Sequence, residues 1–207
     1  RGSGLPINTP AVELLEIGAG GGSIARAELG TIAVGPDSAG ADPGPVCYAN
    51  GGTEPTVTDA NLILGYLDPE YFNDGAFTLD KDAAAAAVTT KIAAPLNLTT
   101  EDAAWGIHLV ATNNMEHAIR IVSVERGRDP RRYAMVAFGG AGPLHAARLA
   151  RKIGVPQVII PKNAGVGSAI GLLSADARVD ASTTRILRLN ETSGKTISAL
   201  YDDLEER

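Results

Sequence analysis

Two glycine clusters are the stretches of this 207-residue sequence whose residue types and spacing most directly allow ligand chemistry. Residues 18–23 read Gly-Ala-Gly-Gly-Gly-Ser, and residues 138–143 read Phe-Gly-Gly-Ala-Gly-Pro. Consecutive glycines allow backbone N–H groups to converge on a phosphate without obstruction by a Cβ atom. A flexible or bulged hairpin turn is the alternative interpretation of the first cluster. The second cluster precedes an expected helix, whose free N-terminal N–H groups favour an anion or a ligand edge.

Neither cluster matches a common nucleotide fingerprint. The dinucleotide pattern Gly-x-Gly-x-x-Gly fails at its third glycine in both clusters, where Ser23 and His145 stand. The sequence also contains no Walker-type phosphate loop, which would read Gly-x4-Gly-Lys followed by Ser or Thr. A Rossmann or P-loop nucleotide site is therefore not expected.

Four carboxylates are candidates for positioning water, a metal ion or an attacking group. Asp59 ends a Thr-Val-Thr-Asp run and Glu125 lies near an expected helix end, and these two are our candidate catalytic residues. Asp37 and Asp42 lie in a long loop. The alternative for Asp59 is that it caps the helix that follows it. The sequence assigns no metal ligands.

The histidines and the single cysteine have simpler interpretations. His145 follows the second glycine cluster and could contact a ligand, but a capping or surface role is favoured. His108 and His117 are nine residues apart on one expected helix and face opposite sides, so a joint metal site is not expected. Cys47 has no histidine nearby in the sequence and is expected to be a buried, unreactive thiol.

The elements that must position these residues begin with β-structure. Apolar runs over residues 11–17, 23–29 and 31–34 alternate with glycine and predict a meander of strands. Residues 35–55 form a stretch rich in glycine, proline and aspartate. A loop of that length inside a compact domain is usually functional or disordered. We expect it to be ordered and to line the site.

Helices are expected next. Asp80 can cap a helix over residues 81–94. Thr99 and Asp102 have the spacing of a capping box, which opens a long helix over residues 100–126. The predicted buried stripe of this helix is Ile107, Ala111, Asn114, Ala118, Ile121 and Val122.

Two strand–helix units complete the expected elements. A buried strand over residues 133–138 and a second strand over residues 155–160 are predicted. Each is followed by a helix, over residues 143–153 and 168–175. Strand–helix–strand spacing this short implies parallel neighbouring strands. A further strand is predicted over residues 178–189. We therefore expect a mostly parallel sheet flanked by helices, with the N-terminal meander at one edge.

Composition excludes several classes of protein. The sequence has 18 Lys and Arg against 24 Asp and Glu, a net charge of −6, whereas nucleic-acid binders need a basic footprint. A single cysteine can form no internal disulfide. No apolar run approaches the ~20 residues that span a bilayer. These features predict a cytoplasmic α/β protein with no nucleic-acid and no membrane partner.

Five motifs stand in a fixed order along the chain: residues 18–24, 35–45, 51–61, 123–127 and 137–145. Together they resemble the hydantoinase A/oxoprolinase family, and the resemblance extends from about residue 11 to residue 185. That family includes ATP-dependent N-methylhydantoinase, 5-oxoprolinase and related subunits of acetone and acetophenone carboxylases. The motifs identify the family rather than the substrate.

The resemblance implies half of an actin-like ATPase, the α/β fold of sugar kinases and heat-shock chaperones, with a mixed sheet flanked by helices. Residues 1–190 would be the C-terminal lobe of that ATPase domain, and residues 191–207 the start of a following helical segment. The family's first phosphate loop, an Asp-x-Gly-Gly-Thr-Phe-Thr-Asp stretch, is absent from the sequence. We therefore expect the chain to be truncated and to lack the N-terminal lobe.

The resemblance also implies a nucleotide site and an activity. The second phosphate-binding hairpin would comprise Gly20, Gly21, Gly22 and Ser23, and the adenosine motif Gly139, Gly140, Ala141, Gly142 and Pro143. ATP and Mg2+ are the implied cofactors. The implied reaction is hydrolysis of a cyclic amide such as a hydantoin or 5-oxoproline, driven by phosphorylation of the amide oxygen. The isolated chain is expected to be inactive.

The implied partners are a small cyclic-amide or ketone substrate, the missing lobe of the same chain and a hydantoinase B-type subunit. Two alternatives to the amide hydrolase remain open. One is the ATPase subunit of a ketone carboxylase. The other is a non-enzymatic actin-like nucleotide switch, whose ATP cycle moves a partner protein.

Overall fold

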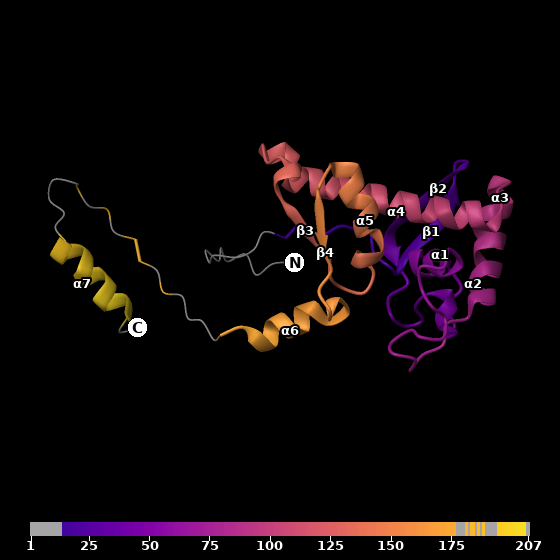
Figure 1. Cartoon of the computed structure of the whole chain (residues 1–207), viewed down its shortest axis with the longest axis horizontal. Coiled ribbons are helices and arrows are strands. Elements are labelled where there is room, and N and C mark those ends of the chain that lie inside the picture. Colours follow the sequence, from indigo (N-terminus) through magenta and orange to yellow (C-terminus); the bar gives the residue numbers. More distant parts are fainter. Residues whose placement is uncertain are drawn as a thin grey trace. The chain divides into compact units, whose positions relative to one another are not determined.

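The computed structural model describes residues 14–176, residues 181, 183, 184, 186 and 188, and residues 194–205. Leu14–Leu172 form one compact unit (Figure 1). The helix α7 (Gly194–Glu205) belongs to a second unit. The strand expected over residues 178–189 lies mostly outside the described residues.

A β-hairpin follows the first glycine cluster, as predicted. β1 (Ser23–Glu28) pairs antiparallel with β2 (Thr31–Ser38), which runs four residues further than expected. Leu29 and Gly30 connect the strands with φ angles of +49° and +77°, the backbone of a two-residue turn that matches strand twist. Residues 14–17 form no strand, which corrects the prediction over residues 11–17 where the structure describes it.

Within the described residues, five short helical segments lie between the hairpin and the long helix in the sequence. α1 (Val57–Ile63) begins after Thr56. α2 (Lys81–Val88) begins at Asp80, whose carboxylate accepts the N–H of Ala83 at 2.8 Å, as predicted. The chain stays helical through a π turn (Thr89–Ala93) and α3 (Ala94–Leu96). A short 3-10 helix (Val46–Tyr48) lies in the long loop.

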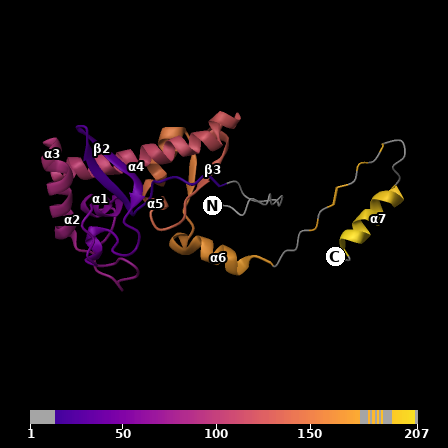
Figure 2. The ribbon, with the colours of Figure 1, turned by 180° about the vertical axis from the view of Figure 1, so that it is seen from behind.

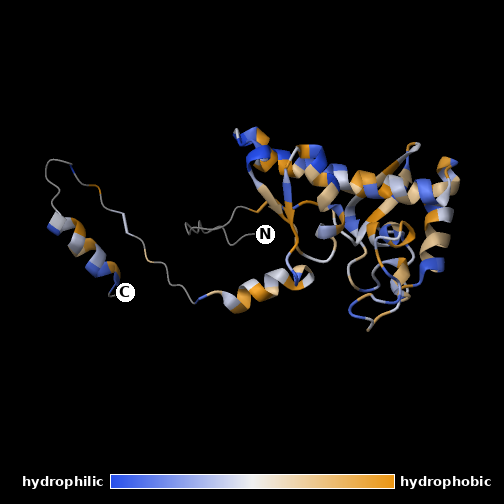
Figure 3. Ribbon diagram, viewed as in Figure 1, coloured by the Kyte–Doolittle hydropathy of each residue, from blue (hydrophilic) through white to orange (hydrophobic). Residues whose placement is uncertain are grey.

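The long helix α4 (Thr100–Val122) connects the two ends of this unit (Figures 1 and 2). Thr99 caps it by accepting the N–H of Asp102 at 3.0 Å, which confirms the predicted start. Its end falls before a 3-10 turn (Val124–Arg126). Figure 3 shows hydrophobic and hydrophilic residues alternating along α4.

The predicted buried stripe of α4 is correct at three of its six positions, half-buried at Ile121 and Val122, and wrong at Asn114. Ile107, Ala111 and Ala118 are buried. Asn114 is exposed, and its amide nitrogen reaches the carbonyl of Val34 at 3.4 Å. The polar side chain thus bonds to the edge of the hairpin rather than entering the apolar core.

The two strand–helix units are confirmed. β3 (Ala134–Val136) and β4 (Gln157–Ile159) are parallel neighbours. α5 (Gly142–Ile153) connects them, and α6 (Gly167–Ser174) follows β4. The first strand was expected to be buried, but Val136 and Phe138 are 53% and 52% exposed among the described residues.

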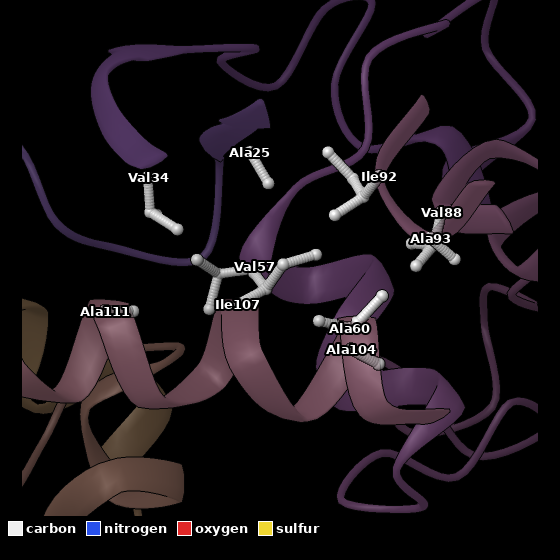
Figure 4. Packing of buried hydrophobic residues seen from close by; sticks show 11 residues of the cluster. Ala25, Val34, Val57, Ala60, Val88, Ile92, Ala93, Ala104, Ile107 and Ala111 are labelled. Carbon is white, nitrogen blue, oxygen red and sulfur yellow. The ribbon is translucent and has the colours of Figure 1, made fainter. Parts of the chain in front are cut away.

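One pair of strands is antiparallel and the other is parallel. In the part of the chain that the structure describes, the two pairs do not join into the single, mostly parallel sheet that the sequence predicts. Among the described residues, β1–β2 and β3–β4 form two separate two-stranded sheets. The main core lies where the hairpin, α1, α2 and α4 meet, as Figure 4 shows. Its buried members are Ala25, Val34, Val57, Ala60, Val88, Ile92, Ala93, Ala103, Ala104, Ile107 and Ala111. Small alanines let these elements approach closely. No helix in the described residues is long and apolar enough to cross a membrane.

Candidate functional site

The two glycine clusters, more than a hundred residues apart in sequence, border the same cavity. Its volume is about 260 Å³, and its wall includes Gly21 and Gly22 from the first cluster and Gly140 and Ala141 from the second. A Cβ atom on Gly21 would lie 3.4 Å from the Cβ of Ala141. The start of β1 and the start of α5 therefore meet at one point. The other lining residues are Gly40, Pro45, Tyr48, Thr58, Asn61, Leu67, Phe72 and Leu144.

Hydrogen bonds hold the first cluster in a defined turn. The N–H of Ser23 donates to the carbonyl of Gly20 at 3.1 Å, and Ser23 Oγ accepts the N–H of Gly20 at 2.9 Å. Both the N–H and the hydroxyl of Thr58 donate to the carbonyl of Gly21 at 2.9 Å. A Cβ atom on Gly21 would lie 2.8 Å from Thr58 Oγ1. These hydrogen bonds argue against the flexible hairpin. The bulged hairpin agrees with the structure, because the register of β1 against β2 shifts between Ser23 and Ala25.

The second cluster leads directly into α5. Gly139 has a φ of +89°, and its N–H donates to the carbonyl of Ala164 at 2.7 Å. Gly142 and Pro143 are the first residues of α5, where the missing N–H of proline breaks no helical bond. Gly142 also borders a second, mostly apolar cavity of about 430 Å³ between β3, α5 and the end of α4. The cluster thus separates two cavities.

Asp59 acts as an anchor inside the fold. It is completely buried at the third position of α1. Its carboxylate accepts four hydrogen bonds: from Thr56 N and Thr56 Oγ1 at 2.8 Å each, from Cys47 N at 2.8 Å and from Val46 N at 3.2 Å. These bonds tie the long loop to the start of α1. The alternative given by the sequence, that Asp59 is the N-cap of a helix beginning at Ala60, is wrong, because α1 begins three residues earlier. Thr56 is the N-cap, and Asp59 is the third helical residue, which completes a capping box with it.

The other candidate carboxylates are not among the residues that line the cavity. Glu125 is exposed in the turn after α4. Asp37 forms an exposed ion pair with Arg26 at 2.9 Å. Asp42 accepts the amide of Asn50 at 3.2 Å. None of the three side chains therefore belongs to the cavity wall.

A buried polar network lies behind the cavity. His108 Nδ1 is 2.8 Å from Asn61 Oδ1, and His145 Nδ1 is 2.9 Å from Thr112 Oγ1. All four residues are buried, so the interpretation of His145 as a capping or surface residue is wrong. The first turn of α5 packs against the buried face of α4, where solvent is excluded. The side chain of His145 therefore forms its hydrogen bond with a residue of α4.

The donors and acceptors of these hydrogen bonds determine which ring nitrogen of each histidine carries the hydrogen. An amide oxygen can only accept, so His108 Nδ1 carries the hydrogen that it donates to Asn61. The hydroxyl of Thr112 donates its single hydrogen to the carbonyl of His108 at 2.8 Å. His145 Nδ1 must therefore be the donor to Thr112, and His145 Nε2 keeps a free lone pair.

Both histidines are neutral near pH 7. Burial lowers the pKa of His145 to about 4, and the neighbouring His108 adds to the effect. Burial also lowers the pKa of His108, with a smaller contribution from the positive charge of Arg148. An uncharged pair is required here, because two imidazolium rings in contact would repel each other inside a low-dielectric interior.

Sequence reasoning did not select Asn61, His108 or Thr112 as site residues. A signal was available for two of them. His108 and Thr112 are one helical turn apart, beside the predicted buried positions Ile107 and Ala111. Polar residues at such spacing on an apolar stripe are uncommon in a core. For Asn61 the sequence carries no comparable signal.

The polar groups at this cavity suit a bound molecule that is rich in oxygen atoms. They do not suit the coordination of a metal ion. A Cβ atom on Gly140 would meet no atom within 4 Å, so open space lies beside this backbone. The wall contains no carboxylate. Within the described part of the chain, no three His, Cys, Asp or Glu side chains gather into a possible metal site. We assign no ligands to Mg2+.

Comparison with known proteins agrees with this fold. A family model described as hydantoinase/oxoprolinase matches residues 2–181. The chain is 48% identical to the caprolactamase subunit alpha of Pseudomonas jessenii over 186 residues, which are 89% of this chain and 27% of that protein.

Two solved structures are similar. The ATP-dependent caprolactamase from Pseudomonas jessenii matches with a TM-score of 0.72 and 47% identity, over 92% of this chain and 28% of that one. Nucleotide-free acetone carboxylase matches with a TM-score of 0.77 and 32% identity, over 91% and 28%. The chain spans less than a third of the length of each of these proteins. This likeness confirms the predicted α/β fold of ATPase type.

Proposed function

The chain belongs to the hydantoinase/oxoprolinase family, and we propose that it is the nucleotide-binding part of a larger ATP-dependent enzyme that opens a cyclic amide (the complete enzyme). In this proposal residues 1–190 are the C-terminal lobe of an actin-like ATPase domain. Residues 191–207 begin a following helical segment. The other lobe and a hydantoinase B-type subunit are the partners.

One observation supports the proposal above all others. Two glycine loops from distant parts of the sequence meet at a cavity of about 260 Å³. Phosphate groups bind where several backbone N–H groups converge without Cβ obstruction. We assign the ATP phosphates to the turn at residues 20–23 and the nucleoside to the loop at residues 139–143.

ATP would supply the chemical drive for cleaving an unstrained amide. In the proposed reaction the amide oxygen attacks the γ-phosphorus and ADP leaves. Water then adds at the activated amide carbon, and cleavage of the C–N bond frees the amine and leaves an acyl phosphate. A second water hydrolyses the acyl phosphate, which gives the carboxylate of the ring-opened product and phosphate. Each ring opened thus consumes one ATP and two waters and releases one ADP and one phosphate.

The residues of this chain contribute mainly by positioning. Such positioning can supply ~7–11 kcal/mol of a barrier. Asp59 holds the long loop against α1, and Thr58 of the same helix holds Gly21. We propose that Asp59 acts through this scaffold. Glu125, exposed beyond the end of α4, has no place in the proposed reaction.

The test is nucleotide binding to the complete enzyme by calorimetry, with Gly140→Val as the informative variant. The new side chain meets no protein atom near its Cβ, so the variant should fold normally and block the cavity. We expect the Kd for a non-hydrolysable ATP analogue to rise at least tenfold. Gly171→Ala, on α6 and also free of clashes, is the control and should leave the Kd unchanged. Unaltered binding to Gly140→Val would contradict the assignment.

A ketone carboxylase subunit is the second candidate, favoured by the similarity to acetone carboxylase. The two activities differ in what ATP consumption requires. Caprolactam, 5-oxoproline and hydantoin should each be tested for ADP release with ring opening. Acetone and acetophenone should be tested for ADP release that depends on bicarbonate. Ketone-dependent ADP release without amide cleavage would favour the carboxylase.

A further inference from the structure

Asn61, one of the residues that line the cavity between the glycine clusters, carries an unpaired amide nitrogen. The residue is completely buried. Within the part of the chain that the structure describes, its Nδ2 group has no hydrogen-bond partner. Buried amide N–H groups in folded proteins are nearly always paired. An unpaired one beside a cavity therefore points to a partner that the described protein groups do not supply.

The hydrogen bond with His108 fixes the orientation of this amide. Asn61 Oδ1 accepts the Nδ1 hydrogen of His108 at 2.8 Å, which leaves Nδ2 as the free end of the side chain. His108 is held in turn between two rings, since it stacks on Trp105 with centroids 5.6 Å apart and on His145 at 4.5 Å. A side chain fixed in this way loses little rotamer freedom when a ligand binds.

Among the side chains of the wall, Asn61 supplies the one amide donor. The hydroxyl of Thr58 already donates to the carbonyl of Gly21. The lining residues include no lysine and no arginine, and Tyr48 carries the other hydroxyl. That hydroxyl can accept as well as donate, and its hydrogen rotates about the C–O bond. The amide of Asn61, held by His108, is thus the side-chain N–H donor of this wall that is fixed in place.

We propose that Asn61 is a ligand-binding residue, whose Nδ2–H donates to an oxygen of the molecule held between the two glycine clusters. His108 and His145 are positioning residues that act through it. The inference rests on the proposed function and deepens it. The acceptor is an oxygen that both candidate ligands carry: a phosphoryl oxygen of ATP or the carbonyl oxygen of the cyclic amide.

Asn61→Asp in the complete enzyme tests the donor. The carboxylate keeps an oxygen for His108 but places a second oxygen where the N–H stood. A carboxylate at this buried position also costs stability, so the melting temperature is measured beside binding and the assays are made where the variant is folded. We expect binding of one ligand to weaken at least tenfold, about 1.4 kcal/mol. A rise in the Kd of the ATP analogue identifies a phosphoryl oxygen. A rise in KM for the amide alone identifies the carbonyl. Asn114→Ala, an exposed asparagine on α4, is the matched control.

His108→Phe tests the positioning role. The ring stack is kept, but the hydrogen donated to Asn61 is lost. We expect the same ligand to be affected as in Asn61→Asp, by a smaller factor of roughly three to five, with kcat changed less than KM or Kd. An effect on kcat alone would overturn the positioning role.

A measurement on the unaltered enzyme keeps the proposal testable if a variant fails to fold. Crystal structures with the ATP analogue and with the amide should place a ligand oxygen within hydrogen-bond distance of Asn61 Nδ2. Ligand oxygens that all lie beyond 4 Å would overturn the proposal. So would Asn61→Asp enzyme that is folded and binds both ligands within twofold of normal. Absence of both ATP binding and amide opening in the unaltered enzyme would instead contradict the proposed function itself.

Discussion

The imidazole ring of His145 stacks on that of His108, with ring centroids 4.5 Å apart and ring planes 13° from parallel. His108 stacks in the same way on Trp105, over which the guanidinium of Arg148 lies at 4.3 Å. This column of rings joins the first half of α4 to the first turn of α5. Because His145 stands just after the second glycine cluster, the stack also fixes that cluster against α4.

The neutral state of His145 makes the stability of the chain depend on pH. The folded pKa is about 4 because the ring is buried, whereas a histidine in an unfolded chain has a pKa of ~6.5. Between these values the unfolded chain binds more protons, so stability is complete above about pH 6.5 and falls as the pH is lowered. We expect urea unfolding to show a loss of about 2 kcal/mol from pH 7 to pH 5, at ~1.4 kcal/mol per pH unit. The lowered pKa of His108 acts in the same direction.

His145→Gln is the variant that isolates this effect. It keeps a polar side chain near Thr112 but cannot titrate, so the pH dependence between 5 and 7 should become shallower. His117→Gln, on the exposed side of α4, should leave the pH dependence as it was. An equally steep dependence in His145→Gln would show that other groups govern acid unfolding.

Asp59→Ala should destabilise the fold rather than only reduce activity. The substitution leaves the buried N–H groups of Val46, Cys47 and Thr56 without their acceptor. Each unsatisfied buried group costs ~1–3 kcal/mol, so a loss of roughly 3 kcal/mol or more is expected in urea unfolding. Asp82→Ala, at an exposed position in the first turn of α2, should change stability by less than about 0.5 kcal/mol. Equal stability of the two variants would remove the anchoring role.

Local sequence patterns predicted most of the helices and strands, but few of the tertiary contacts between their side chains. Asp80 and Thr99 cap α2 and α4 as expected, because a cap depends on residues within one helical turn. The burial of His145 depends on α4 crossing the first turn of α5, and no spacing within residues 138–145 contains that information. The exposure of Asn114 also depends on a tertiary contact. The helical spacing placed Asn114 on the correct face of α4, but the edge of the hairpin beside that position is polar.

Cys47 should react slowly with thiol reagents in the folded chain. Burial raises the pKa of its thiol, and the nearby negative charge of Asp59 raises it further. Only the thiolate is nucleophilic, so both the charge state and access oppose the reaction. We expect modification by a maleimide at pH 7.5 to be on the order of a hundredfold slower than in denaturant. The Asp59→Ala variant should react faster, since it loosens the loop that contains Cys47. Rapid labelling of the folded, unaltered chain would contradict this environment.

The 207-residue chain by itself should not turn over ATP at a useful rate. The cavity wall carries two glycine loops and Asn61, but no carboxylate to position an attacking group and no cation to neutralise developing charge. Contacts with the backbone of these loops are enough for weak binding, with a Kd on the order of 1 mM, which needs only about 4 kcal/mol. Calorimetric titration of ATP with Mg2+ into the chain, followed by a phosphate-release assay, measures both quantities. Weak binding without steady phosphate release is the expected result. Sustained turnover would mean that the chain contains a complete catalytic site, and the proposal that it is one part of a larger ATPase would then be wrong.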